Sequence, residues 1–348
     1  MYKQFYNLIS RNKFIITLIR KNDSEFNFLS LKYSIKYDAF FSTKISFEDS
    51  RINNIFSKSR LEKIKITTIK KAIKKVLNFF MLFNVTSDVN SPLKISISLI
   101  LPVSGNMVKL FDFENNLVYI YFYNKNDYES QKPKIHQIQV YFNTPILRFD
   151  DYNKRIIEKF INYTNKSDLS LFEKKTAFNS FLIDYYKYIN SSSLVIYLNI
   201  SYAYIKIQLE KYPFVRLDIN KLKNINFKMP IVNFKWDLGY SNLMVNKTKY
   251  IMIDYDEFVD VYMLYPVFIF LNSLSNVETK DMYINFFKDE FEDFLLPIYK
   301  SISNDFASLD SIQIISMHFL LLLDYIDIGK LPLDKSNVID IYKRILMI

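Results

Sequence analysis

The chain has no cysteine, which excludes disulfides and thiolate metal ligands and is typical of a reducing compartment. Only three of its 348 residues are glycines, Gly105, Gly239 and Gly329. Its two histidines, His136 and His318, lie far apart in apolar surroundings, so a zinc site or a histidine-dependent nucleophile has too few candidates. Long apolar runs are also missing, because none reaches the roughly 20 residues of a membrane-spanning helix. We therefore expect a cytoplasmic protein, soluble or peripheral at a membrane surface.

Half of the residues are apolar, which is enough for a sizeable core in one large domain or two smaller ones. The formal net charge of +10 suits an anionic partner such as a nucleotide, a nucleic acid or a membrane surface. Lys, Asn, Ile, Tyr and Phe are abundant, however, as in proteins of AT-rich genomes, so much of this charge reflects codon composition. We therefore do not expect nucleic acid as the partner.

The clearest functional pattern lies between Phe234 and Phe258, FKWDLGYSNLMVNKTKYIMIDYDEF. A polar loop precedes an apolar strand (LMV), and a turn (NKTK) leads to a second strand (YIMI) that ends in an acidic run. This pattern predicts a β-hairpin, which brings the loop before its first strand close to the residue after its second. Asp237, Asn242 and Asp254 are therefore expected to converge at one end of the hairpin.

Carboxylate and amide oxygens are preferred ligands of Mg²⁺, and phosphate and water complete its octahedron. The hairpin thus predicts a metal–phosphate site. The alternative is structural, because Asp and Asn are also common in turns and at strand ends.

An Asp, four residues, an Asn and then an apolar strand that ends in Asp resembles the catalytic loop and metal-binding Asp of protein-kinase-like phosphotransferases. The run Asp254-Tyr255-Asp256 is most similar to the aminoglycoside phosphotransferase and choline kinase type. The resemblance implies that Asp237 accepts the proton of a substrate hydroxyl while Asn242 and Asp254 hold Mg²⁺ against the phosphates of ATP. Lys235 would offset charge on the transferred phosphoryl group.

The resemblance also implies an α+β fold of the bilobal protein-kinase-like type, with a small β-rich lobe, a larger mainly helical lobe and an N-terminal extension. We place the extension at 1–93, the nucleotide-binding lobe at 94–162 and the helical catalytic and substrate lobe at 163–348. Within 94–122 the period-two pattern predicts three strands, and the turn Ser104-Gly105-Asn106 would cover the phosphates. The last strand of this lobe would lead through Glu158 and Phe160 into a hinge that meets the adenine ring.

Two residues depart from the family pattern. The third strand has Tyr121, or alternatively Tyr119, where the family has a phosphate-binding Lys, and the following helix has Gln137 where the paired Glu is expected. A Tyr–Gln pair could form a hydrogen bond, so that no charge is left unpaired. Lys109, on the preceding strand, is the nearest cation that could replace the missing one if strand alternation points it inward.

Downstream of residue 163, we expect a helix at 171–189, a second that precedes the catalytic loop, by resemblance, at 194–212, and three more after the hairpin, at 258–275, 281–302 and 311–326. Upstream, Arg60–Phe83 has apolar residues at helical spacing among many lysines, which predicts a basic amphipathic helix. Its segment Arg60–Lys75 could contact an anionic membrane weakly, or simply pack its apolar face and solvate its charges.

The predicted activity is the ATP- and Mg²⁺-dependent transfer of a phosphoryl group to a hydroxyl of a small molecule, with a sugar or saccharide as the first candidate acceptor. Two alternatives remain open. One is a catalytically silent kinase-like scaffold that binds nucleotide or a protein partner, which the replaced Lys and Glu favour. The other is a basic structural protein associated with nucleic acid, which would bind polyanions with steep salt dependence.

Overall fold

A computed structural model describes the chain in two compact units, Met1–Val140 with Thr144–Tyr163 and Tyr141–Asn143 with Thr164–Ile348. The described residues are 15, 17–18, 26–27, 31–34, 39–42, 44–46, 48–56, 95–103, 107–162, 168–191, 195–222, 227–235, 242–246, 248–253, 258–274, 286, 291–294, 296–302, 309–329 and 334–346. The expected basic helix at 60–83 lies outside them. No helix in the described part of the chain is long and apolar enough to cross a membrane.

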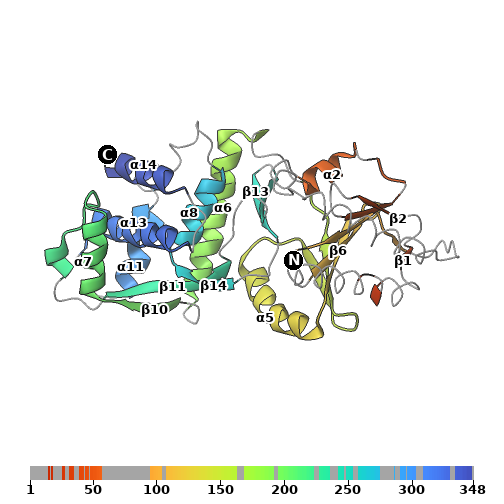
Figure 1. The fold of residues 1–348 in the computed structure, drawn as a ribbon, viewed down its shortest axis with the longest axis horizontal. Coiled ribbons are helices and arrows are strands. Elements are labelled where there is room, and N and C mark those ends of the chain that lie inside the picture. The colour runs from red at the N-terminus through yellow and green to blue at the C-terminus, as the bar shows by residue number, and fades with distance from the viewer. Residues whose placement is uncertain are drawn as a thin grey trace, which may run out of the picture. The chain divides into compact units, whose positions relative to one another are not determined.

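The first unit is built on a seven-stranded antiparallel sheet with the order β2-β3-β5-β6-β7-β9-β8 (Figure 1). Its strands are β2 Leu31–Ser34, β3 Ala39–Ser42, β5 Leu99–Pro102, β6 Met107–Asp112, β7 Leu117–Phe122, β8 Ile146–Asp150 and β9 Arg155–Lys159. A short parallel pair, β1 Phe26–Asn27 with β4 Ile95–Ser96, and the helices α2 Ser50–Ile55 and α5 Lys125–Tyr141 complete this unit. Strands β2 and β3, from the expected N-terminal extension, pair with this same sheet.

Strand register divides the sheet into two faces. Val108 pairs with Tyr121 and Leu110 with Tyr119, so these residues share one face, where they pack in a core cluster with Ile157, Ile15 and Leu18. The other face, called here the α5 face, carries Phe122, whose ring lies 5.7 Å from that of Tyr128 on α5. Phe149 on β8 likewise contacts His136 of α5 at 5.4 Å between ring centroids.

The second unit contains a three-stranded antiparallel sheet with the order β10-β11-β14 and a separate β12–β13 hairpin. These strands are β10 Val195–Ile200, β11 Phe227–Lys235, β12 Leu243–Asn246, β13 Lys249–Met252 and β14 Phe258–Tyr262. The helices are α6 Leu171–Asn190, α7 Tyr202–Lys211, α8 Tyr265–Leu274, α10 Phe291–Phe294, α11 Leu296–Ile302, α13 Ser311–Asp327 and α14 Lys335–Leu346, with a 3-10 turn at Ile219–Leu222.

Helix α13 is the centre of the helical part, because all its residues from Ile314 to Asp324 are buried. Helices α7 and α14 pack against it (Figure 1). A second cluster of buried aromatic rings joins α6 to the sheet, with Phe234 of β11 at 5.4 Å from Tyr185 and 5.3 Å from Tyr188.

The α+β prediction of a β-rich part followed by a mainly helical part is confirmed. The three strands within 94–122, the β12–β13 hairpin and the helices at 171–189 and 311–326 are confirmed as well. Two helix predictions are wrong in part: 194–212 is strand β10 followed by α7, and 258–275 begins with strand β14 before α8. Their β-branched and aromatic residues favour strands, and the backbones of β10 and β14 complete a sheet with β11.

Candidate functional site

The hairpin that was expected to carry the site is built by a period-two pattern. Leu243 pairs with Met252 and Val245 with Tyr250, and these four side chains form its buried face. Helix α6 covers that face, with the Phe181 and Tyr250 rings 5.6 Å apart. The hairpin therefore has a fixed register and a fixed position against α6.

The ends of the hairpin meet as predicted. Ile253 N donates to the backbone carbonyl of Asn242 at 2.9 Å, so the residue before β12 lies opposite the residue after β13. Asn242 is one of the predicted metal ligands, and only 5% of it is exposed. Lys235 is the last residue of β11 and Phe258 the first of β14. These two residues pair with each other, so β11 ends where β14 begins.

Two stretches of sequence are therefore bounded by the same paired residues. Residues 236–241 connect Lys235 to Asn242, and residues 254–257 connect Ile253 to Phe258. Both stretches, which contain Asp237 and Asp254, lie outside the described residues, as does the Lys235 side chain. Within the described part of the chain, no group of three or more His, Asp or Glu residues could hold a metal.

In the first unit, the predicted residues fall on different faces of the sheet. Lys109 pairs with Ile120 and lies, partly buried, on the α5 face; Tyr121 lies on the opposite face. Lys109 and Tyr121 therefore do not line one site. The turn 104–106 lies outside the described residues, but Val103 N donates to Met107 O at 3.1 Å, which closes a β5–β6 hairpin around it.

The suggested Tyr121–Gln137 pair does not form. Gln137 is exposed on α5, whereas the Tyr121 hydroxyl accepts a hydrogen bond from Arg155 Nη1 at 2.6 Å on the far face. Sequence reasoning missed Arg155, a cation that is only 3% exposed and pairs with Asp150 at 2.7 Å. The sequence did contain a sign of this ion pair: Arg155 is the lone cation at the start of the run RIIE, and Asp150 precedes the turn that leads into it.

Asp150 shows how this buried cation acts on its neighbours. Burial would raise the pKa of its carboxyl, but hydrogen bonds from Asn153 and the charge and hydrogen bond of Arg155 outweigh burial and hold the pKa below its ordinary value. The Arg155 guanidinium also lies 5.1 Å from the Tyr119 ring centroid. Arg155 thus organises the core of the sheet.

The expected hinge residues are engaged within the sheet. Glu158 is 4% exposed and pairs with Val118 on one side and Ile146 on the other. Phe160 N donates to the Asn116 carbonyl at 2.7 Å. The Phe160 N–H is therefore already bonded within the sheet and is not available to an adenine ring, whereas a hinge contact at Glu158 stays a prediction.

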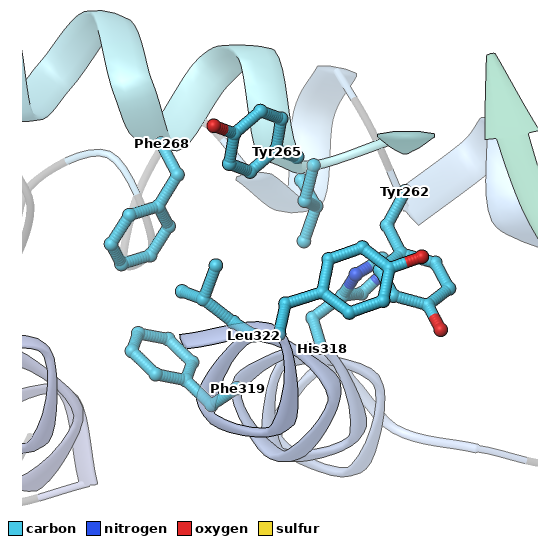
Figure 2. A pocket seen from close by; sticks show the side chains of 8 residues that line it. Tyr262, Tyr265, Phe268, His318, Phe319 and Leu322 are labelled. Atoms are coloured by element: carbon cyan, nitrogen blue, oxygen red, sulfur yellow. The ribbon is translucent and has the colours of Figure 1, made fainter. Parts of the chain in front are cut away.

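One aromatic pocket lies elsewhere in the second unit, between α8 and α13 (Figure 2). Its lining is Tyr262, Leu264, Tyr265, Phe268, His318, Phe319, Leu322 and Tyr325. The void among these side chains is about 20 Å³, which has room for about one water molecule. It is too small for a substrate, and none of the predicted site residues lines it.

No protein-family model matches the sequence, and no curated protein matches it significantly. Solved structures similar to the chain include a choline/ethanolamine kinase family protein from Mesorhizobium loti, with 11% identity, a TM-score of 0.32 and coverage of 81% of this chain and 94% of that one. Another is the GDP complex of aminoglycoside 2'-phosphotransferase-IIIa, with 8% identity, a TM-score of 0.33 and coverage of 80% and 97%.

A third is a thermostable mutant of aminoglycoside phosphotransferase APH(4)-Ia in complex with ADP and hygromycin B, with 10% identity, a TM-score of 0.34 and coverage of 72% and 93%. These proteins are of the kinase-like type that the hairpin motif resembles. Because their TM-scores are below 0.5, these structures indicate neither the activity nor the substrate of this chain.

Proposed function

We propose that the chain is a kinase-like phosphotransferase that binds Mg²⁺ and the phosphates of ATP at the β12–β13 hairpin. One observation supports the proposal: the register of the hairpin and of the β11–β14 pair gives two short connecting segments the same paired end residues. One segment contains Asp237, and the other begins with Asp254. In this proposal these two carboxylates and the Asn242 amide come together at one end of the hairpin, where they offer oxygens of the kind that Mg²⁺ prefers.

In this proposal Asn242 and Asp254 hold the metal, and Asn242 fits this role because its amide belongs to a buried residue at the hairpin end. Bound Mg²⁺ would neutralise charge on the β- and γ-phosphates. Asp237 accepts the proton of the acceptor hydroxyl while that oxygen bonds to the γ-phosphorus. The bond from the γ-phosphorus to the bridging oxygen breaks, and ADP leaves with its electron pair.

In the first unit, we propose that Lys109 binds phosphate, rather than Tyr121, which stands at the position of the family's Lys. Lys109 lies on the α5 face and is partly buried, whereas Tyr121 is only 3% exposed in the core cluster of the opposite face. Lys235, at the end of β11, is the second proposed cation. A sugar or saccharide hydroxyl remains our proposal for the acceptor.

The test compares thermal unfolding with and without Mg²⁺ and ATP. A ligand that binds only the folded state stabilises it by about 2.7 kcal/mol at 100 times its Kd. We expect Mg²⁺ and ATP together to raise the unfolding temperature of the unmodified chain. Asp254→Ala should lose this rise. Asp260→Asn is the matched control, because Asp260 is an exposed acid on β14 and should leave the rise intact. No rise in the unmodified chain at millimolar nucleotide would refute the proposal.

A catalytically silent scaffold is the second candidate, favoured by the absence of the Tyr121–Gln137 pair. Asp237→Asn separates the two candidates, since it should keep nucleotide binding and abolish phosphoryl transfer in an acceptor screen. A scaffold would bind nucleotide and transfer nothing, with or without this substitution.

A further inference from the structure

The outer edge of β13 is occupied by a single residue, Asn143. Strand β13 pairs with β12 on one side only, among the described strands. On its other side, Met252 N donates to the Asn143 carbonyl at 2.9 Å, and Asn143 Nδ2 donates to the Tyr250 carbonyl at 2.8 Å. Asn143 N also approaches the Tyr250 hydroxyl at 3.4 Å. Asn143 thus bonds two backbone groups of β13 that a third strand would otherwise pair.

Asn143 is itself held in place by its neighbour. Phe142 is 4% exposed, and its ring lies 5.2 Å from Phe234 of β11 and 5.3 Å from Tyr188 of α6. Tyr250 is fixed independently, since its hydroxyl donates to Asp184 Oδ2 of α6 at 2.5 Å. The contact between Asn143 and β13 therefore joins two parts that are each anchored to the same helix.

The contact bears directly on the proposed metal site. Met252, which Asn143 holds, is followed by Ile253, and Ile253 bonds to the carbonyl of Asn242. Asp254 is the next residue in the sequence. A two-stranded hairpin depends on its surroundings for stability. Helix α6 supports the buried face of this one, and Asn143 supplies the hydrogen bonds at its outer edge, so Asn143 contributes to how firmly these atoms are held.

We propose that Asn143 is a positioning residue for the metal and nucleotide, acting through β13 on Ile253 and Asn242; this rests on the function proposed above. Groups that hydrogen-bond directly to metal ligands typically contribute about 10- to 100-fold to metal affinity, and Asn143 acts on Asn242 less directly, through Met252 and Ile253. The role requires no contact between Asn143 and the ligand.

Two variants test this role, Asn143→Ala, which removes the bond to the Tyr250 carbonyl, and Asn143→Asp, which keeps the size but cannot donate. Tyr185→Phe is the matched control, because it removes a buried hydrogen bond of 2.6 Å to the Met263 carbonyl and leaves the hairpin contacts intact. We measure the affinity for Mg²⁺ with ATP well below every Tm, and the hydrogen exchange of residues 243–253.

Both Asn143 variants should weaken binding by about tenfold or more and speed exchange in the hairpin, whereas Tyr185→Phe should lower Tm without either effect. Unchanged exchange would overturn the inference. Faster exchange with unchanged affinity would overturn it too, because Asn143 would then be merely structural. Failure of the unmodified chain to bind refutes the proposed function instead and is seen before any variant is made.

Discussion

His318 is a histidine held in an environment that disfavours its charge. It lies on α13, only 6% exposed, and its Nε2 shares a hydrogen bond with the Tyr299 hydroxyl. Burial lowers the pKa of this imidazole to about 3 from an ordinary value of 6.5. The folded chain therefore binds fewer protons than the unfolded chain at mildly acidic pH.

This difference predicts a loss of stability well above the pH at which carboxylates titrate. Because the unfolded histidine gains a proton below about pH 6.5, the free energy of unfolding should fall by about 1.4 kcal/mol between about pH 7.5 and about pH 5.5. His318→Gln, which does not titrate, should remove this decrease. Urea unfolding at the two pH values measures it, and equal decreases in both proteins would assign the effect to another group.

At the scale of elements, helix α6 supports the candidate site. Its buried side carries Phe181 and Tyr188, and Asp184 accepts a hydrogen bond from Tyr250 of the hairpin. The helix begins with a complete capping box, in which the Ser170 hydroxyl accepts from Glu173 N and the Glu173 carboxylate accepts from Ser170 N.

Ser170→Ala should therefore lower the free energy of unfolding by about 1 kcal/mol, since it leaves an N-terminal amide of α6 without its partner. Lys175→Ala, an exposed change in the same helix, should alter it by less than about 0.5 kcal/mol. Urea titration at neutral pH compares the two. A Ser170→Ala protein as stable as the Lys175→Ala protein would mean that packing alone fixes where α6 begins.

The elements that the sequence predicts well are those whose pattern is local. The turn NKTK and the alternating residues beside it identify the β12–β13 hairpin, and regular spacing identifies α6 and α13. Strands β10 and β14 could not be predicted in this way, because they exist through pairing with β11. Pro266, in the first turn of α8, was an unused indication of where the helix begins after β14.

In the candidate site, too, local features could be predicted from the sequence and features that depend on strand pairing could not. The convergence of Asn242 with the residue before Asp254 follows from one hairpin and was predictable. The opposite orientations of Lys109 and Tyr121 depend on the register between β6 and β7, which a single sequence does not give. Arg155 was missed because its partners come from two other strands.

At the scale of the whole molecule, tyrosine takes a place in the core that aliphatic residues usually fill. The chain has 27 tyrosines and 32 phenylalanines. Among the residues that the structure describes, the largest fully buried side chains include Tyr128, Tyr185, Tyr188, Tyr250, Tyr299 and Tyr342. Burial is the largest cause of the raised pKa of Tyr185, Tyr188 and Tyr250. Each hydroxyl must stay protonated while the chain is folded.

Stability should consequently be lost at alkaline pH. Since the pKa of these hydroxyls is raised by folding, their contribution is complete below about pH 10 and decreases as the pH rises further, when the unfolded chain ionises first. Absorbance at 295 nm and circular dichroism should show the buried tyrosines ionising together with unfolding, after exposed ones such as Tyr152. Full ionisation without any change in circular dichroism would contradict this expectation.

The Asn143 contact has a further consequence for how molecules of this protein behave at high concentration. The Met252 N–H and the Tyr250 carbonyl are groups through which a strand of another molecule could add to β13, and Asn143 occupies both of them. An open strand edge promotes intermolecular β-pairing and aggregation. Asn143 therefore closes this edge. Any residue at this position would still offer its backbone carbonyl to the Met252 N–H, but loss of the asparagine side chain would free the Tyr250 carbonyl for pairing with another copy of the chain.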